Sequence, residues 1–293
     1  MPSSSAHPTP STTAPWKPLF ATHVSKLASP EFSLATVTSK GIPRTRTCIH
    51  RGFFASPLPE NPHNKHPPNP HVYDSDCPTF TTDARMSKVY DIFASGPGKG
   101  SLEQSRSGSG GGGHVEACYW VKDTMCQWRI IGKCWLISAD DIEPGEEGPD
   151  SSAQNSGTVT VKAELGRYMR PSLTNDPPSK IADWSWKREV ETHFTNLSPI
   201  MRGSFKNPPP GQPVSSGSGP GEKLGQTAGD LEDEPLARQN FRVAVIAPEV
   251  VEMVDLSNPE KSRRVRWCLS EEAGGPGGEG RPLGEWNEIE LWP

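Results

Sequence analysis

Pro43-Arg-Thr-Arg-Thr-Cys-Ile-His-Arg51 is the stretch from which both the fold and the site can be read. Its pattern is that of a β-strand, in which alternate side chains point to the same face. One face would carry Arg44, Arg46, Cys48 and His50, and the other Thr45, Thr47, Ile49 and Arg51. So many cations in a sheet wall are costly to bury unless an anion binds beside them. The stretch therefore predicts a strand next to an anion site; the alternative is a strand face open to solvent.

A second basic stretch, Phe80-Thr-Thr-Asp-Ala-Arg-Met-Ser-Lys88, follows further along the chain. It predicts a strand over 78–82 that breaks at Asp83, and then a helix over 87–93 with Ser87 as its N-cap. The start of a helix presents free N–H groups and the positive end of a dipole, which attract anions. Both stretches together predict one phosphate-bearing ligand held by Arg46, Arg51, Thr81, Thr82, Arg85 and Lys88. The alternative for the second stretch is an ordinary capped helix with surface charges.

The composition limits the class of protein. The chain has 293 residues with a formal net charge of -5, and only 32% of its residues are hydrophobic. An acidic chain without a dominant basic face is not expected to bind nucleic acids in general, so a local basic cluster favours a small anionic ligand. The N-terminus lacks an apolar signal region and no stretch is long enough to span a membrane. Six cysteines without a CxxC pair are expected in a reduced compartment, so the cytoplasm is the default. A mitochondrial location has weak support from the Ser/Thr-rich start.

Several tracts are too rich in Gly, Pro, Ser and Asn to bury much apolar surface. The chain holds 28 glycines and 32 prolines, and many lie in these tracts. We predict a disordered tail over 1–14, and one domain over 15–293 interrupted by low-complexity insertions at 57–70, 96–113, 143–156, 208–234 and 274–280.

The remaining segments alternate between strand-like and helix-like patterns. Helices are expected at 16–27, 87–93 and 184–197, and strands at 33–38, 44–54, 78–82, 114–122, 127–138, 158–163, 240–254, 263–269 and 285–292. Antiparallel strands in hairpins with helices at the edges predict an α+β, mainly β, fold built on a β-barrel. The βαβ rhythm, a GxGxxG, a P-loop and a nucleophile elbow are all absent from the sequence.

Three further groups of polar residues could bind a ligand or a metal ion. Gln127 opens a strong strand and can both donate and accept hydrogen bonds, as a flavin or pyrimidine edge requires, although a glutamine there is usually solvated. Arg264 and Arg266 share a strand face, where they either extend an anion pocket or pair with Glu249, Glu252 or Asp255. The spacing of His63, His66, His71 and Cys77 would allow zinc, but nothing organises them tetrahedrally, so no metal site is predicted.

In this order, the segments resemble the pyridoxamine 5'-phosphate oxidase-like FMN-binding proteins of the split β-barrel class. The resemblance rests on Ile42–Phe53 and Phe80–Lys88, on Cys126-Gln-Trp-Arg-Ile-Ile-Gly132, and on Leu197-Ser-Pro-Ile-Met-Arg-Gly-Ser-Phe205. It continues in Phe241-Arg-Val, Arg263-Arg-Val-Arg-Trp267 and Leu291-Trp-Pro293. It implies a split β-barrel with peripheral helices, and a homodimer with FMN at the subunit interface.

The resemblance also implies roles for single residues. Arg46 and Lys88 correspond to ligands of the FMN phosphate, Gln127 to the glutamine at the isoalloxazine edge, and Arg266 to an arginine on the flavin. The other implied cofactor contacts are Thr47, Cys48, Ile49, Arg51, Thr81, Thr82, Arg85 and Ser87. Arg51, Arg202, Ser204 and Arg264 correspond to substrate contacts. Classical oxidases carry Ser-Arg-Lys where this chain has Met86-Ser-Lys88, so Arg85 is the candidate substitute for their arginine.

The activity implied by the resemblance is oxidation of an amine such as pyridoxamine phosphate with O₂, in vitamin B6 metabolism. The small-molecule partner would then be a pyridoxal-type phosphate. Two alternatives stay open at this point. One is another FMN-dependent enzyme, such as a reductase supplied by a nicotinamide. The other is a flavin-binding protein without turnover.

Overall fold

The computed structural model describes residues 13–61, 67–96, 100–142, 156–172, 178–219, 221, 223–270 and 284–293. Ten strands occur in this part of the chain: β1 Glu31–Val37, β2 Pro43–Ile49, β3 Tyr73–Asp74, β4 Thr79–Asp83, β5 Gly110–Val121, β6 Cys126–Ile137, β7 Arg170–Pro171, β8 Phe241–Asp255, β9 Arg263–Leu269 and β10 Trp286–Leu291. The expected α+β, mainly antiparallel architecture is confirmed.

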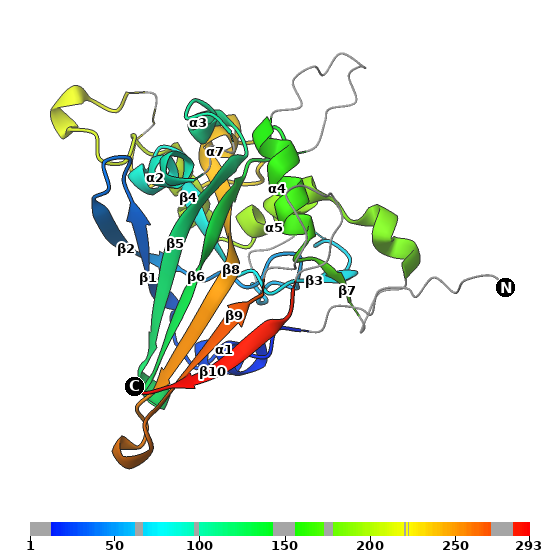
Figure 1. Ribbon diagram of the computed structural model, residues 1–293. Helices are drawn as coiled ribbons and strands as arrows, with labels where there is room; N and C mark the ends of the chain where they lie inside the picture. The colour runs from blue at the N-terminus through cyan, green and yellow to red at the C-terminus, as the bar shows by residue number, and fades with distance from the viewer. Residues whose placement is uncertain are drawn as a thin grey trace.

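The helices lie around the strands (Figure 1). They are α1 Lys17–Val24, α2 Ser87–Ser95, α3 Gln104–Ser107, α4 Ser156–Gly166, α5 Trp186–Thr195, α6 Pro199–Gly203 and α7 Pro235–Asn240. Short 3-10 turns complete them: η1 Lys122–Thr124, η2 Pro178–Asp183, η3 Ser204–Lys206, η4 Val214–Ser216 and η5 Pro259–Lys261. In Figure 1, α1 lies across one end of the long strands and α2, α3 and α7 gather at the other.

The main sheet is ordered β10-β9-β8-β6-β5-β1-β2, with β4 added to β8. The long strand β8 changes its neighbour along its length: Phe241–Val245 pairs with β4, whereas Val250–Asp255 pairs with β9. Beyond the end of β2, the Arg51 N–H donates to the Thr79 carbonyl (2.8 Å) and the Thr79 N–H donates to the Gly52 carbonyl (2.9 Å). These bonds bring the two basic stretches of the sequence side by side.

Two hydrophobic clusters hold the fold together, one on each side of the central strands. The first joins α1 to the strands through Phe20, whose ring meets Tyr119 and Trp128 edge-on at 5.0 and 5.4 Å. The second packs α4 and α5 against the other side and includes Phe194 and Phe241, with ring centroids 5.1 Å apart. Aromatic pairs in this geometry contribute beyond the area that they bury.

The stretch 158–163 is a helix and not the expected strand. Its Thr-Val-Thr-Val pattern favours a strand because β-branched side chains prefer extended backbone. In the structure it belongs to α4, where Val161 and Leu165, four residues apart, are both fully buried. Helical packing of this face against the second cluster therefore outweighs the local preference.

The insertion expected at 96–113 is also partly wrong. Residues 104–107 form α3, and the glycines 110–113 begin the strand β5, where they are buried. A Cβ on Gly113 would collide with the Ile92 carbonyl of α2, and one on Gly112 would lie 2.5 Å from the Trp135 ring. The glycines are therefore needed for close approach, and this run is not a flexible linker.

The other tracts behave differently from one another. Residues 57–61 and 67–70 contain no helix or strand, and the only helical segment in the described part of 208–234 is the 3-10 turn η4. Yet Ala228 and Leu231 in the latter tract are buried in the second cluster. The expected insertions at 143–156 and 274–280 lie outside the described residues, apart from the start of α4, and so do residues 1–12 of the expected tail.

Candidate cofactor site

A cavity of about 410 Å³ lies where the end of β2, the strand β4 and the start of α2 meet. Its far wall comes from α6, η3 and the loop after them. The lining residues are Thr47, Cys48, Ile49, Arg51, Thr81, Thr82, Asp83, Met86, Lys88, Met201, Ser204, Phe205, Asn207, Pro208, Pro210 and Leu224. Eight residues named from the sequence are thus brought together here: Thr47, Cys48, Ile49, Arg51, Thr81, Thr82, Lys88 and Ser204.

Arg51 presents an unpartnered guanidinium to this cavity. Its Nε is buried and has no hydrogen-bond partner, and in the described part of the chain its side chain forms no ion pair. Burial lowers the pKa of the Arg51 guanidinium, because a charged group loses its hydration there. A buried donor without an acceptor is costly, so the site is suited to an anion that would accept from Arg51.

Lys88 is the second cation of the cavity and is only 7% exposed. Its Nζ donates to the Thr82 hydroxyl (3.0 Å) and lies 2.7 Å from the Met86 sulfur. Burial lowers the pKa of the Lys88 ammonium, and no carboxylate among the described residues forms an ion pair with it. Two desolvated cations without an anionic partner therefore face one cavity.

Arg46 lies beside this cavity but does not line it. Its Nη1 donates to the Thr36 hydroxyl (2.7 Å) and to the Leu34 carbonyl (3.2 Å), and its Nη2 is 3.5 Å from the Asp91 carboxylate. Thr36 in turn donates to Asp91 at 2.8 Å, and both residues are buried. Arg46 is thus held by a hydroxyl and a carboxylate, and Asp91 lies on the same helix as Lys88.

Replacing Thr36 with valine is expected to lower the free energy of unfolding by about 1–3 kcal/mol, because the half-buried Arg46 and the buried Asp91 lose the hydroxyl between them. Chemical denaturation measures the change. The exposed Thr22→Val is the matched control and should cost much less, since its hydroxyl bonds only to the Pro18 carbonyl. Equal losses in both variants would contradict the bridging role.

The turn before α2 differs from the expectation at two residues. Arg85 does not line the cavity. Its guanidinium donates two hydrogen bonds to the Asp83 carboxylate, of 2.9 and 2.6 Å, and one each to the Asn207 and Phe205 carbonyls. Ser87 is exposed and is the first residue of α2, not its N-cap. Met86 occupies the capping position and its side chain forms no capping hydrogen bond, so this helix start lacks the expected serine cap.

Gln127, Arg264 and Arg266 lie far from the cavity within one chain. Thr81 pairs with Val243 of β8, whereas Gln127 pairs with Val254. Val243 and Val254 are eleven residues apart on β8, which at about 3.3 Å per residue places Thr81 and Gln127 roughly 35 Å apart along this strand.

The ion pairing weighed for the two late arginines is confirmed. Arg266 Nε donates to one oxygen of Glu252 (2.6 Å), and Arg264 Nε donates to the other (3.1 Å). Burial favours a raised pKa for the Glu252 carboxyl, but the hydrogen bonds from both arginines outweigh it and lower the pKa.

Arg202 and Ser204 separate in space. Ser204 lines the cavity and its hydroxyl donates to the Met201 carbonyl at 2.6 Å. Arg202 points elsewhere: it is 7% exposed, its Nε is buried without a partner, and its Nη1 is 3.9 Å from Asp230.

Sequence reasoning missed most of the far wall of the cavity. The wall residues that it did not name are Met201, Phe205, Asn207, Pro208, Pro210 and Leu224. Three of them fall in a tract interpreted as a disordered insertion. The available signal was the Leu197–Phe205 motif followed by prolines, which begins with Ser198 as the N-cap of α6.

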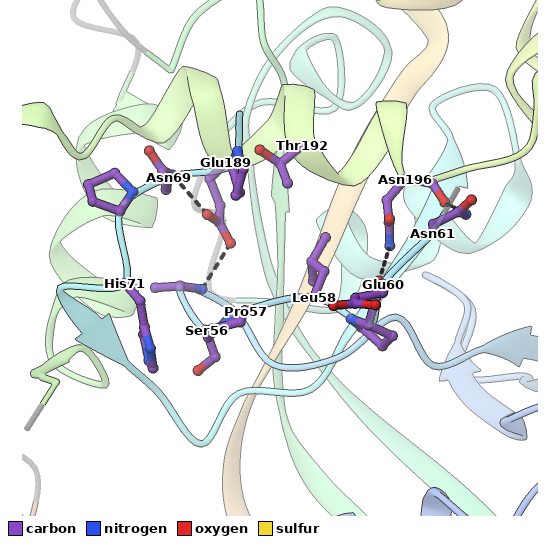
Figure 2. Close-up of a pocket in the computed structure, with 14 residues that line it drawn as sticks. Ser56, Pro57, Leu58, Glu60, Asn61, Asn69, His71, Glu189, Thr192 and Asn196 are labelled. Atoms are coloured by element: carbon purple, nitrogen blue, oxygen red, sulfur yellow. Dashed lines mark hydrogen bonds between the residues drawn. The ribbon is translucent and has the colours of Figure 1, made fainter. Parts of the chain in front are cut away.

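A larger cavity of about 730 Å³ lies elsewhere, between the loops around residues 55–61 and 68–71 and the helix α5 (Figure 2). None of the residues named from the sequence as binding a cofactor or substrate lines it. Its buried carboxylate, Glu189, already accepts hydrogen bonds from the Ala55 N–H (3.0 Å) and the Asn69 amide (2.9 Å), as Figure 2 shows. Glu189 therefore joins the two loops to α5. The smaller cavity is the better candidate, because it holds the unpartnered cations.

His50, next to Arg51, makes stability depend on pH. Burial, and then the Arg51 charge, lower the pKa of its imidazole to about 4. The unfolded chain binds this proton near pH 6.5, so stability is present above that pH and is lost as the pH falls towards 4. We expect a loss of about 2 kcal/mol between pH 7 and pH 5 that is absent in His50→Gln. Urea unfolding at both pH values measures it, and identical pH dependence in the two proteins would contradict it.

Within the described residues, no helix is long and apolar enough to cross a membrane. Among the same residues, no group of three or more His, Cys, Asp or Glu side chains is arranged to hold a metal ion. His63 and His66 lie outside the described residues.

Comparison with known proteins identifies the class. Residues 13–138 match the family model of the pyridoxamine 5'-phosphate oxidase FMN-binding domain. This confirms the resemblance drawn from the sequence over that stretch, which includes β2, β4, α2 and the two unpartnered cations. The stretch is an FMN-binding domain of this family, and FMN is its cofactor.

The individual proteins that this chain resembles share only a low sequence identity with it. An uncharacterized protein of Saccharomyces cerevisiae, YGR017W, is 22% identical over 320 residues, covering 96% of this chain and 98% of the yeast protein. A pyridoxamine 5'-phosphate oxidase-related, FMN-binding protein from Nostoc punctiforme is 19% identical with a TM-score of 0.49, covering 96% of this chain and 99% of the other. PhzG from Burkholderia lata, solved with tetrahydrophenazine-1-carboxylic acid, is 13% identical with a TM-score of 0.42, covering 96% and 94%.

Proposed function

We propose that this protein is an FMN-dependent oxidoreductase of the pyridoxamine 5'-phosphate oxidase type, oxidising an amine such as pyridoxamine phosphate with O₂. The observation that carries the proposal is the pair Arg51 and Lys88, two desolvated cations that share one cavity and lack a carboxylate partner. A phosphate would supply the missing acceptors, since charge-assisted bonds to phosphate are among the strongest that these side chains form.

In the proposed complex, Arg51 and Lys88 bind the phosphate, and the hydroxyls of Thr81 and Thr82 lie beside it. The Arg46 guanidinium, oriented by Thr36 and Asp91, adds positive potential from behind. FMN supplies the two-electron acceptor chemistry, and the protein supplies position and electrostatics. Met201, Phe205 and Leu224 give the far wall an apolar surface against which the flavin would pack.

We further propose that the active form is a homodimer of split β-barrels with FMN at the interface. The supporting observation is the spacing along β8 in one chain, which separates Thr81 of the cavity from Gln127 by roughly 35 Å and from Arg266 by roughly 30 Å. These residues could meet the same FMN only from a second subunit. The sheet face that carries them also exposes Trp120 (44%), opposite Gln127, and Ile289 (48%), opposite Arg266. Exposed apolar side chains of this kind suit a subunit interface.

The split-barrel interpretation rests on the two partners of β8 and on the bonds between residues 51–52 and Thr79. The proposed compartment is the cytoplasm, in keeping with six cysteines that are all free thiols.

The test is made in steps on the purified full chain. FMN should be bound, with a flavin absorbance band, and added FMN should raise the melting temperature because it binds only the folded state. Peroxide formation with pyridoxamine phosphate is then followed, and nicotinamide oxidation is followed separately. Peroxide formation supports the oxidase. Nicotinamide oxidation alone would replace it by a reductase, and failure of both reactions would leave a flavin-binding protein without turnover.

A further inference from the structure

Asn207 has a free side-chain amide in the wall of the cofactor cavity. It lies in the loop that follows η3, outside the stretch matched by the family model. Its Oδ1 is buried without a hydrogen-bond partner, and its amide group makes no bond within the described part of the chain. A buried acceptor left without a donor costs free energy, so this amide is suited to a ligand that donates.

The backbone around Asn207 is fixed. Arg85 Nη1 donates to the Asn207 carbonyl (3.0 Å) and Arg85 Nη2 donates to the Phe205 carbonyl (3.3 Å). The Asn240 amide also donates to the Phe205 carbonyl at 2.8 Å. Because Arg85 is itself anchored by two bonds to Asp83, it ties the far wall of the cavity to the turn that leads to Lys88.

We propose that the Asn207 amide contacts a hydroxyl of the ribityl chain of FMN, and that Arg85 is a positioning residue that holds Asn207 at this place. The proposal rests on FMN binding in this cavity. A hydroxyl can donate to the buried Oδ1, whereas a phosphate oxygen is only an acceptor. Lys88 and Arg51 therefore recognise the phosphate, and Asn207 recognises the polyol next to it.

FMN and riboflavin, which lacks the phosphate, distinguish the two contacts. Asn207→Ala should weaken both flavins equally, by roughly 3–10-fold, as expected for a neutral hydrogen bond. Lys88→Met should weaken FMN much more than riboflavin. Fluorescence titration of the full chain gives the dissociation constants. Asn207→Ala removes no side-chain hydrogen bond within the described residues, so the variant is expected to fold.

Each of the other possible binding results would contradict a specific part of the proposal. Unchanged binding of both flavins by Asn207→Ala would overturn the contact, and a loss for FMN alone would overturn its assignment to the hydroxyl. If the wild type bound neither flavin, the cofactor site itself would be overturned together with this inference. Loss of turnover in the wild type with flavin binding intact would count only against the proposed reaction.

Arg85→Lys tests the positioning role, because lysine keeps the charge facing Asp83 but has three donors on one nitrogen and cannot reproduce the four bonds that the Arg85 guanidinium makes through three nitrogens. It should weaken both flavins by a few-fold when Asn207 is present, and have no further effect in the Asn207→Ala background. Additive losses in the double variant would show that Arg85 acts without Asn207. That result would overturn the positioning role, because a turn-stabilising residue would affect both backgrounds alike.

Discussion

Replacing Lys88 with methionine is expected to weaken FMN binding by roughly 10–150-fold, the largest effect on the cofactor of any single change considered. The ammonium is buried, and it should form a charge-assisted bond with the phosphate that is worth about 1.5–3 kcal/mol. Methionine keeps the length and apolar character of the stem, so the loss reports the charge. Quenching of flavin fluorescence during titration measures it.

Lys187→Met is the matched control. Lys187 lies on α5, where its ammonium is 2.9 Å from Glu232 and 3.5 Å from Glu191, and its side chain is 35% exposed. This variant should bind FMN as the wild type does. An affinity of Lys88→Met within about threefold of the wild type would remove Lys88 from the phosphate site, since even a weak charge-assisted bond exceeds that change.

Replacing Asp76 with alanine is expected to have the largest effect on stability, a loss of about 3–5 kcal/mol. The buried Asp76 carboxylate accepts two bonds from Arg170, of 2.7 and 2.8 Å, and one from the Ala14 N–H at 3.0 Å. Its removal would leave the Arg170 guanidinium uncompensated in the interior, which costs more than the pair contributes when intact. Urea denaturation gives the change in unfolding free energy.

Asp140→Ala is the corresponding control, because Asp140 also pairs with an arginine, Arg238, at 2.6 Å, but on the surface. Its loss should be about 1 kcal/mol or less. Similar losses in the two variants would mean that burial of Asp76 has no special weight. The same hydrogen bonds hold Ala14 in the buried part of the structure, so the expectation of a disordered tail over 1–14 is wrong for this residue.

The strands were predictable because an antiparallel sheet imposes a period of two on the sequence. β9 has the predicted bounds, and β1, β4, β6 and β8 are within a few residues of theirs. The helix α4 was missed because Val161 and Leu165 form a helical face only once the second cluster exists to receive it. The glycine run 110–113 was missed because its role depends on Ile92 and Trp135, which are distant in sequence.

The site residues that lie close together in the sequence could be predicted, whereas those brought together from distant segments could not. Arg51, Thr81, Thr82 and Lys88 lie in two basic stretches whose strands end at the same place. The partner of Arg46 and the far-wall partners of Arg85 could not be inferred, because Asp91 and the Phe205 and Asn207 carbonyls become neighbours of these arginines only through folding. The far wall has no periodic pattern, since it consists of short helical turns and prolines, so its residues carry no signal of burial.

The glycines at the start of β5 have a consequence for the strength of the cofactor site. With no side chain at Gly113 to act as a spacer, α2 rests on the backbone of β5, and a Cβ on Gly111 would already lie 2.9 Å from Ile92. This same helix carries Lys88 and Asp91. The depth at which the Lys88 ammonium lies, and hence its loss of hydration, therefore depends on Gly111 and Gly113 of β5, which let α2 approach this strand closely. A substitution that moves α2 away from β5 would therefore change the affinity for the FMN phosphate, even though the substituted residue does not itself contact FMN.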